Sequence, residues 1–199
     1  AQTSSDTLEA FLANETLTSL QDERYIKVAR QPLVIIYRIN LLLNPTEFAS
    51  KFREECRKLG IGEIYLSSVL AFNIGNAIGI GFDDNIEFPV HGVSHVSVID
   101  EVNIFSGSFS GNVFSYPDVV KTELDKNILF PRLRGVMPSW DNEARKPSSG
   151  HVIHGSTPEL YQAWLQGICH KTITERPESQ RFVFINAWNE WAEGAHLEP

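Results

Sequence analysis

Short apolar runs alternate with helix-like segments along most of the chain. The runs are rich in β-branched and aromatic residues and are bounded by Pro, Gly or Asn, which is typical of buried strands. We expect five parallel strands in sequential order, at 33–38, 63–69, 82–88, 132–140 and 181–188. We expect helices at 45–59, 116–130 and 157–168, a weaker helix from Thr16 toward Pro32, and irregular chain at 90–112 and 141–156. This alternation predicts parallel βα units in an α/β fold.

Polar residues gather after the expected strands, where ligands bind in α/β barrels and in doubly wound sheets. No glycine-rich nucleotide motif follows any strand, and each strand ends in candidate site residues, which favours the barrel. A (β/α)8 TIM barrel takes roughly 250 residues. We therefore expect 1–199 to be a single domain, the C-terminal portion (about five βα units) of such a barrel, with its N-terminal strands missing from this chain. Residues 1–15 are expected to be a flexible segment.

The stretch NAWNEWAEG near the end of the chain carries the strongest chemical signal. Glu190 and Glu193 are three residues apart, a spacing that brings both carboxylates to one side of a helical turn. Two carboxyl groups, one ionised and one kept protonated by burial, are what acid/base work on a glycosidic bond requires. Trp188 and Trp191 would form an apolar wall or flat faces for sugar rings. The alternative is that the tryptophans are core residues and the glutamates are solvated on a loop.

Other strand ends supply further candidates. Trp140, Asp141 and Asn142 would offer a stacking ring with polar groups for sugar hydroxyls, or else an Asx-type turn beside a packed tryptophan.

Single residues complete the candidate set. Arg145 would neutralise an acidic group in the same site or be a solvated loop residue. Glu87 would bind substrate or cap a turn, and Tyr37 would reach substrate, while Arg38 would pair with a carboxylate.

Composition excludes several classes of partner. A net charge of −8 and a pI near 5.2 argue against nucleic acid, and no apolar run is long enough for a transmembrane segment. His151 and His154 have no third ligand at a usual spacing, so no metal site is expected. The acidic pair Asp83-Asp84 would hold a divalent cation only if a sugar nucleotide were the donor.

Several segments in the same order resemble one protein family. They are ERYIKVARQPLVIIYR, FDDNIEFP, FSGNVFSYPDVV, RGVMPSWDNEARK, HGSTPELYQAWL and NAWNEWAEGAHLEP. From about Leu17 onward the chain resembles the WbsX-like proteins of bacterial polysaccharide biosynthesis. That family is similar to the endo-α-mannosidase family of glycoside hydrolases.

The resemblance implies roles for the residues of the terminal motif. Glu190 would be the base that acts on the sugar 2-hydroxyl, and Glu193 the general acid/base that protonates the leaving oxygen. Glu198 would bind or orient the sugar. Apart from the resemblance, Asn189 is a further substrate-binding candidate, as a hydrogen-bond donor next to Glu190.

The implied activity is glycosyl transfer in the biosynthesis of a bacterial lipopolysaccharide, O-antigen or capsule. The alternatives are a retaining endo-glycosidase and a non-catalytic carbohydrate-binding domain. The expected partner is an oligosaccharide or polysaccharide, with a sugar nucleotide as an optional donor. The expected location is the cytoplasm, with a peripheral position at the inner membrane left open.

Overall fold

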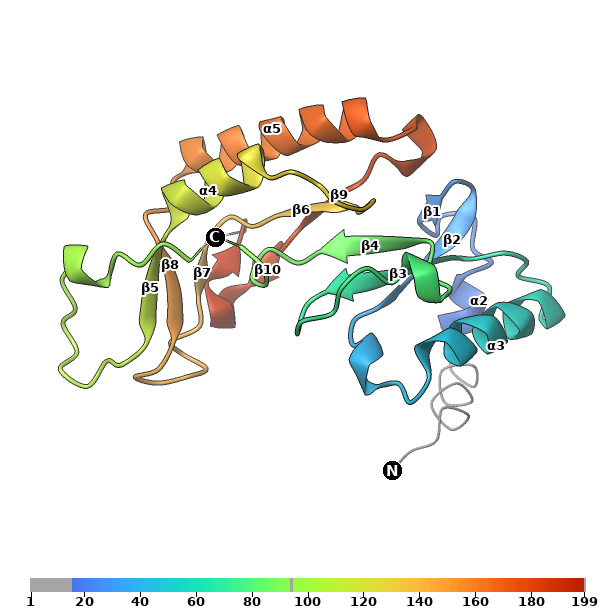
Figure 1. Cartoon of the computed structure of the whole chain (residues 1–199), viewed down its shortest axis with the longest axis horizontal. Helices are drawn as coiled ribbons and strands as arrows, with labels where there is room; N and C mark the ends of the chain where they lie inside the picture. The colour runs from blue at the N-terminus through green and yellow to red at the C-terminus, as the bar shows by residue number, and fades with distance from the viewer. Residues whose placement is uncertain (1–15, 94, 199) are drawn as a thin grey trace. The chain divides into compact units, whose positions relative to one another are not determined.

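The computed structural model describes residues 16–93 and 95–198, which form two compact units (Figure 1). The first unit comprises 16–87, 130–133 and 177–181, and the second comprises 88–93, 95–129, 134–176 and 182–198. The expected flexible segment at 1–15 lies outside the described residues. The single barrel domain over 1–199 stays a prediction, and each unit is described separately.

The first unit is built on a parallel sheet whose strands follow their order in the sequence. They are β2 (Gln31–Ile36), β3 (Tyr65–Leu70) and β4 (Asp84–Glu87). Leu133 adds a parallel bridge to Ile86 at the β4 edge. The expected strands at 33–38, 63–69 and 82–88 are confirmed in order and direction. Each of their ends differs from the expected one by one or two residues.

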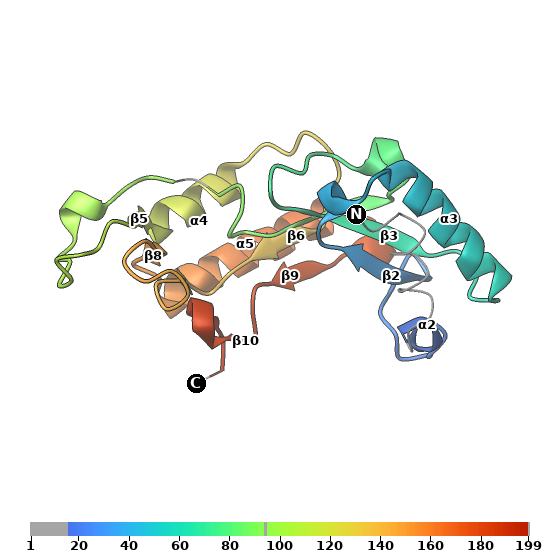
Figure 2. The ribbon, with the colours of Figure 1, turned by 90° about the horizontal axis from the view of Figure 1, so that it is seen from below.

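Helix α3 (Pro45–Lys58) covers one face of this sheet (Figure 2). The Asn44 side chain caps it by accepting a hydrogen bond from the Glu47 amide at 3.1 Å. Phe52 and Cys56, one helical turn apart, are fully buried in a cluster that includes residues of β2 and β3. The expected helix at 45–59 is therefore confirmed, and its apolar stripe is what attaches it to the sheet.

The weak helix expected from Thr16 to Pro32 is wrong. The structure has α2 (Thr16–Ser19), then β1 (Lys27–Val28), which pairs antiparallel with the start of β2. Ala29 and Arg30 take left-handed backbone angles, φ 49° and 69°, and form the two-residue turn between these strands. A two-residue hairpin turn requires such angles, and alanine and arginine are not residue types that predict them.

In the second unit, β6 (Arg134–Val136) pairs in parallel with β9 (Val183–Ile185), as expected for the last two strands. Helices α4 (Tyr116–Asp125) and α5 (Pro158–Glu175) run side by side, and α5 packs on both strands (Figure 1). Gly167 permits this approach, since a Cβ there would collide with the Leu124 side chain. Helix α4 ends five residues earlier than expected, and α5 continues seven residues further.

A second sheet in this unit was not expected. Its order is β5 (Asn112–Ser115), β8 (His151–His154) and β7 (Trp140–Asp141), with β8 parallel to β5 and antiparallel to β7. The predicted strand at 132–140 is therefore wrong at its end, because it stops at Val136 and Trp140 belongs to another sheet. The segments expected to be irregular, 90–112 and 141–156, contribute the first residue of β5, all of β8 and Asp141 of β7.

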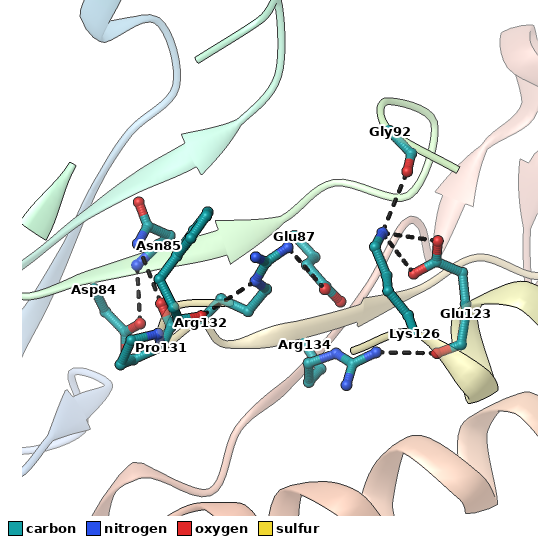
Figure 3. A network of polar contacts seen from close by, with 10 residues as sticks. Asp84, Asn85, Glu87, Gly92, Glu123, Lys126, Pro131, Arg132 and Arg134 are labelled. Atoms are coloured by element: carbon teal, nitrogen blue, oxygen red, sulfur yellow. Dashed lines mark hydrogen bonds and ion pairs between the residues drawn. The ribbon is translucent and has the colours of Figure 1, made fainter. Parts of the chain in front are cut away.

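Buried charges are paired within each unit (Figure 3). In the first unit, Glu87 lies 3.6 Å from the Arg132 guanidinium, and both side chains are about one-tenth exposed. In the second unit, the Arg134 guanidinium donates to the Glu123 carbonyl at 3.2 Å, and the Lys126 ammonium donates to the Glu123 carboxylate at 2.9 Å. Buried charges are costly without such partners, so these contacts fix the chain segments that carry them.

The two cysteines should differ sharply toward an alkylating reagent. Burial raises the pKa of the Cys56 thiol to about 11, and the side chain has no exposed surface. At pH 8 only about one such thiol in a thousand is the reactive thiolate. Iodoacetamide should therefore modify the partly exposed Cys169 and leave Cys56 unmodified. Peptide mass spectrometry reads the result, and both residues should react in 8 M urea. Equal labelling of the native protein would contradict the packing of α3.

Candidate active site

The terminal motif forms a tight hairpin in the second unit. Strand β10 (Asn189–Glu190) pairs antiparallel with β11 (Ala195–His196) across a 3-10 turn, Trp191–Glu193. Gly194 follows in the left-handed conformation with φ 59°, and the Ser139 hydroxyl donates to its carbonyl. The strand expected at 181–188 is thus limited to Val183–Ile185, and the motif lies beyond it.

Glu190 and Glu193 share one guanidinium. Arg145 Nη2 lies 3.2 Å from Glu190 Oε1 and donates a hydrogen bond to it, while Arg145 Nε lies 3.5 Å from Glu193 Oε1 in an ion pair. Both carboxylates therefore point to the same side of the hairpin. Their side chains are 34% and 21% exposed, so a ligand can reach the pair.

The tryptophans of the motif are exposed rather than packed in the core. Trp188 is 64% exposed and Trp191 57%. The Trp188 indole N–H donates to Glu198 Oε1 at 2.9 Å, and the backbone amide of Glu198 donates to the Trp188 carbonyl. Glu198 thus holds Trp188 in place. Exposed aromatic faces fixed in this way suit stacking on sugar rings, whereas the apolar wall expected around the glutamates is replaced by Arg145.

Residues 140–142 follow the alternative interpretation, a turn beside a packed tryptophan. Trp140 is 6% exposed and belongs to the core of the second unit, so its ring is not a stacking surface here. The buried Asn142 accepts a hydrogen bond from the His151 amide at 2.7 Å, and its carbonyl accepts from the Arg145 amide at 3.0 Å. Asp141 is exposed and accepts from the Glu143 amide at 2.9 Å. This turn is what places Arg145.

Tyr37, Arg38 and Glu87 belong to the first unit. Tyr37 is 46% exposed, and its ring centroid lies 5.6 Å from that of Phe72 in a T-shaped arrangement. Arg38, expected to pair with a carboxylate, instead places its guanidinium over the Phe72 ring at 4.1 Å. Glu87 is 8% exposed and pairs with Arg132, which favours a structural role over substrate binding.

Two residues near the motif were undervalued from sequence. Arg145 was as well explained as a solvated loop residue, because nothing local marks a contact with a residue 45 positions away. Asn186 carries a buried amide nitrogen that has no hydrogen-bond partner among the residues the structure describes. Its position directly after strand β9 is a signal that could have pointed to it, since strand ends line ligand sites in α/β folds.

Asp84 is the first residue of β4 and Asp83 precedes it, and both acidic side chains already have partners within the first unit. Asp83 Oδ2 lies 2.7 Å from Arg53 Nη2 and accepts from the Leu66 amide, while Asp84 accepts from the Tyr65 hydroxyl at 2.8 Å. Within 16–93 and 95–198, no group of three or more His, Cys, Asp or Glu side chains is arranged to hold a metal ion. Nor does any helix of the described chain reach the length and apolarity needed to span a membrane.

Solved structures with the same fold are glycoside hydrolase-like. One titled "Glycoside hydrolase-like protein" matches with a TM-score of 0.61 and 14% identity, over 98% of this chain and 54% of its own. Two structures of the GH99 endo-alpha-mannosidase from Bacteroides thetaiotaomicron match all of this chain, with TM-scores of 0.53 and 0.55, at 13% and 12% identity and over 56% and 53% of their own length. The chain thus has the α/β fold of part of a glycoside hydrolase-like, barrel-type protein.

The family follows from the sequence. The family model described as "Glycosyltransferase WbsX" matches residues 1–199, and the chain belongs to this family. Two curated relatives, both named "Uncharacterized protein WxcX" and from Xanthomonas campestris pv. campestris strains B100 and ATCC 33913, are 38% and 37% identical over 194 residues. The alignments cover 96% of this chain and 27% of each relative, so the chain spans about a quarter of their length.

The hairpin should depend on glycine at position 194. A Cβ there would lie 3.1 Å from the Asp141 Cβ and 3.2 Å from its amide nitrogen, in a left-handed conformation that alanine disfavours. Gly194→Ala should lower the free energy of unfolding by about 1–2 kcal/mol. Gly107→Ala is the matched control, since no atom lies within 4 Å of its Cβ. Urea unfolding compares them, and equal stability of the two variants would contradict the turn geometry.

Proposed function

We propose that the protein is a carbohydrate-active enzyme that carries out glycosyl transfer in the assembly of a bacterial lipopolysaccharide, O-antigen or capsule. Glu190 and Glu193 are its catalytic pair, and an oligosaccharide or polysaccharide is its substrate. Membership of the WbsX family and the glycoside hydrolase-like fold support the action on glycans. The expected cytoplasmic location stays a prediction.

The observation that carries this proposal is the contact of both carboxylates with Arg145. The contacts are unequal, because Glu190 accepts a guanidinium hydrogen bond at 3.2 Å whereas Glu193 meets the guanidinium at 3.5 Å as an ion pair. A charge-assisted hydrogen bond engages the carboxylate form. Arg145 thus favours the carboxylate form of both groups, and the closer contact is the one with Glu190. We assign the role of base to Glu190 and the role of proton donor to Glu193 from the resemblance of the E-W-x-E-G element to that of the mannosidase relatives.

These roles give a balanced two-step reaction. Glu190 takes the proton of the donor sugar's 2-hydroxyl while that oxygen attacks the anomeric carbon, and Glu193 gives its proton to the leaving oxygen. A 1,2-anhydro sugar remains. The acceptor hydroxyl then attacks the anomeric carbon and gives its proton to Glu193, and the 2-oxygen regains its proton from Glu190. Both carboxyl groups end as they began, and the anomeric configuration is retained.

A second candidate activity is retaining endo-glycosidic hydrolysis, in which water replaces the acceptor. The structural neighbours titled endo-alpha-mannosidase favour this candidate, and the residue roles are the same for both. A non-catalytic carbohydrate-binding domain would bind sugar through the exposed Trp188 and Trp191 and would not require the pair of glutamates.

Replacing Glu193 with Gln should lower turnover of an oligosaccharide donor by roughly 10²–10⁴-fold, because the leaving sugar hydroxyl needs the proton. A sugar nucleotide donor should lose less, since its diphosphate leaves without protonation. Glu175→Gln, at the exposed end of α5, is the control and should leave both rates unchanged. The assay uses the full-length protein with oligosaccharides alone or with a panel of sugar nucleotides, and mass spectrometry identifies the products.

The product pattern separates the candidates. A lengthened acceptor indicates transfer, and a shortened oligosaccharide indicates hydrolysis. An unchanged rate in Glu193→Gln would overturn the assignment of the pair. Sugar binding that is lost in Trp188→Ala, together with no turnover by the unaltered protein, would instead indicate a binding domain.

A further inference from the structure

A shallow cavity of about 420 Å³, open to solvent, lies in the second unit between the segment 101–109 and strands β5 and β8. Its lining is more apolar than polar, and the polar residues among it are Glu101, Asn103 and His154. Among the lining residues are Val102, Phe109, Val113 and Val152, together with Asn103 and His154. Its volume is in the range of small-molecule sites, which is about 300–1,000 Å³, and neither the sequence pattern nor the catalytic pair accounts for it.

Strand register places this cavity on the same sheet face as the active-site turn. Val113 of β5 is paired with Val152 of β8, and Val152 is in turn paired with Asp141 of β7. Cross-strand partners project from the same face of a sheet. The neighbouring pair, Ile153 and Trp140, projects from the opposite face into the core.

From Asp141 the same face leads to the catalytic hairpin. Asp141 lies against Gly194, the residue after Glu193, as the 3.1 Å approach of a Gly194 Cβ shows. Thus one cross-strand step, from Val152 to Asp141, separates the cavity wall from the residue that packs on the hairpin.

The loop that walls the cavity is also hydrogen-bonded to the loop that carries Arg145. The Ser110 amide donates to the Ser148 carbonyl at 2.7 Å, and the Ser108 and Ser148 hydroxyls are 3.1 Å apart. The Glu143 carboxylate in turn accepts hydrogen bonds from the amides of Ser148 and Gly150. The cavity and the guanidinium are therefore held by one connected set of loops.

We propose that this cavity is a second sugar subsite, which binds a glycan residue bearing a methyl group, such as a 6-deoxy sugar or an N-acetylhexosamine. The inference rests on the proposed action on glycans and extends it to a residue next to the one at the carboxylates. The apolar wall receives the methyl group, and Asn103 and His154 meet ring hydroxyls or the amide.

Ligand-observed NMR on the full-length protein tests the subsite without any need for turnover. The probes are methyl α-L-rhamnopyranoside, methyl N-acetyl-β-D-glucosaminide and, as the hydroxylated comparison, methyl α-D-mannopyranoside. We expect the methyl protons of the first two to receive the strongest saturation and the mannoside to bind roughly tenfold more weakly. Val152→Phe fills the cavity with a residue that strands accept, and it should abolish the methyl signal.

Three further variants make the result specific. His154→Ala and Asn103→Ala should each weaken binding of the probes. These two variants test the subsite if Val152→Phe does not fold. Phe105→Ser, on the same loop with a 99% exposed ring that does not line the cavity, should change nothing.

The outcomes separate this inference from the proposed function. Glu193→Gln should keep the methyl signal while it loses turnover. A methyl signal together with no turnover by the unaltered protein would leave the subsite intact and overturn the enzyme. Turnover with an unchanged signal in Val152→Phe would overturn the subsite alone. Absence of a signal from both methyl-bearing sugars, or binding of farnesyl phosphate in their place, would also overturn it.

Discussion

The site depends on the contact of one guanidinium with two carboxylates that would otherwise repel each other. The 3-10 turn brings Glu190 and Glu193 to one side, and Arg145 offsets the repulsion from a loop 45 residues earlier. The gross attraction at 3.2–3.5 Å is several kcal/mol, but these side chains are a fifth to a half exposed, so the net gain is about 1 kcal/mol or less. An ion pair of that strength cannot order a loop by itself. The hydrogen bonds of Asn142 and Glu143 must hold Arg145 in position, and the electrostatic contact follows from them.

Local patterns were sufficient to predict the order and direction of the parallel strands, α3 with its cap, and the glutamate spacing. Each of these depends on residues close together in the chain. The strand at 132–140 failed at Pro138, which cannot donate to a sheet ladder, and that break could have been read from the sequence. Strands β5 and β8 were missed because each has four residues and gains its stability from a partner almost 40 positions away.

The aromatic residues show why residue type alone did not settle the site. Trp140 lies in β7 and Trp188 follows β9, both in the second unit, yet one is 6% exposed and the other 64%. Trp140 pairs with Ile153 in a sheet that covers the core, whereas Trp188 lies beyond the last pair of β9 and is held by Glu198. Exposure thus follows from sheet pairing, which short patterns of apolar residues do not encode.

The additional sheet gives the second unit a feature that simple βα repetition would lack. In a parallel unit the chain leaves each strand end and returns through a helix, so strand-end residues are the ones near a ligand. Here β7 turns back antiparallel along β8, and the register sets Asp141 beside Val152 on one face. The antiparallel pair therefore extends the ligand-facing surface sideways from the hairpin to β5. The segment that looked irregular in sequence is therefore the part that connects the two proposed sites.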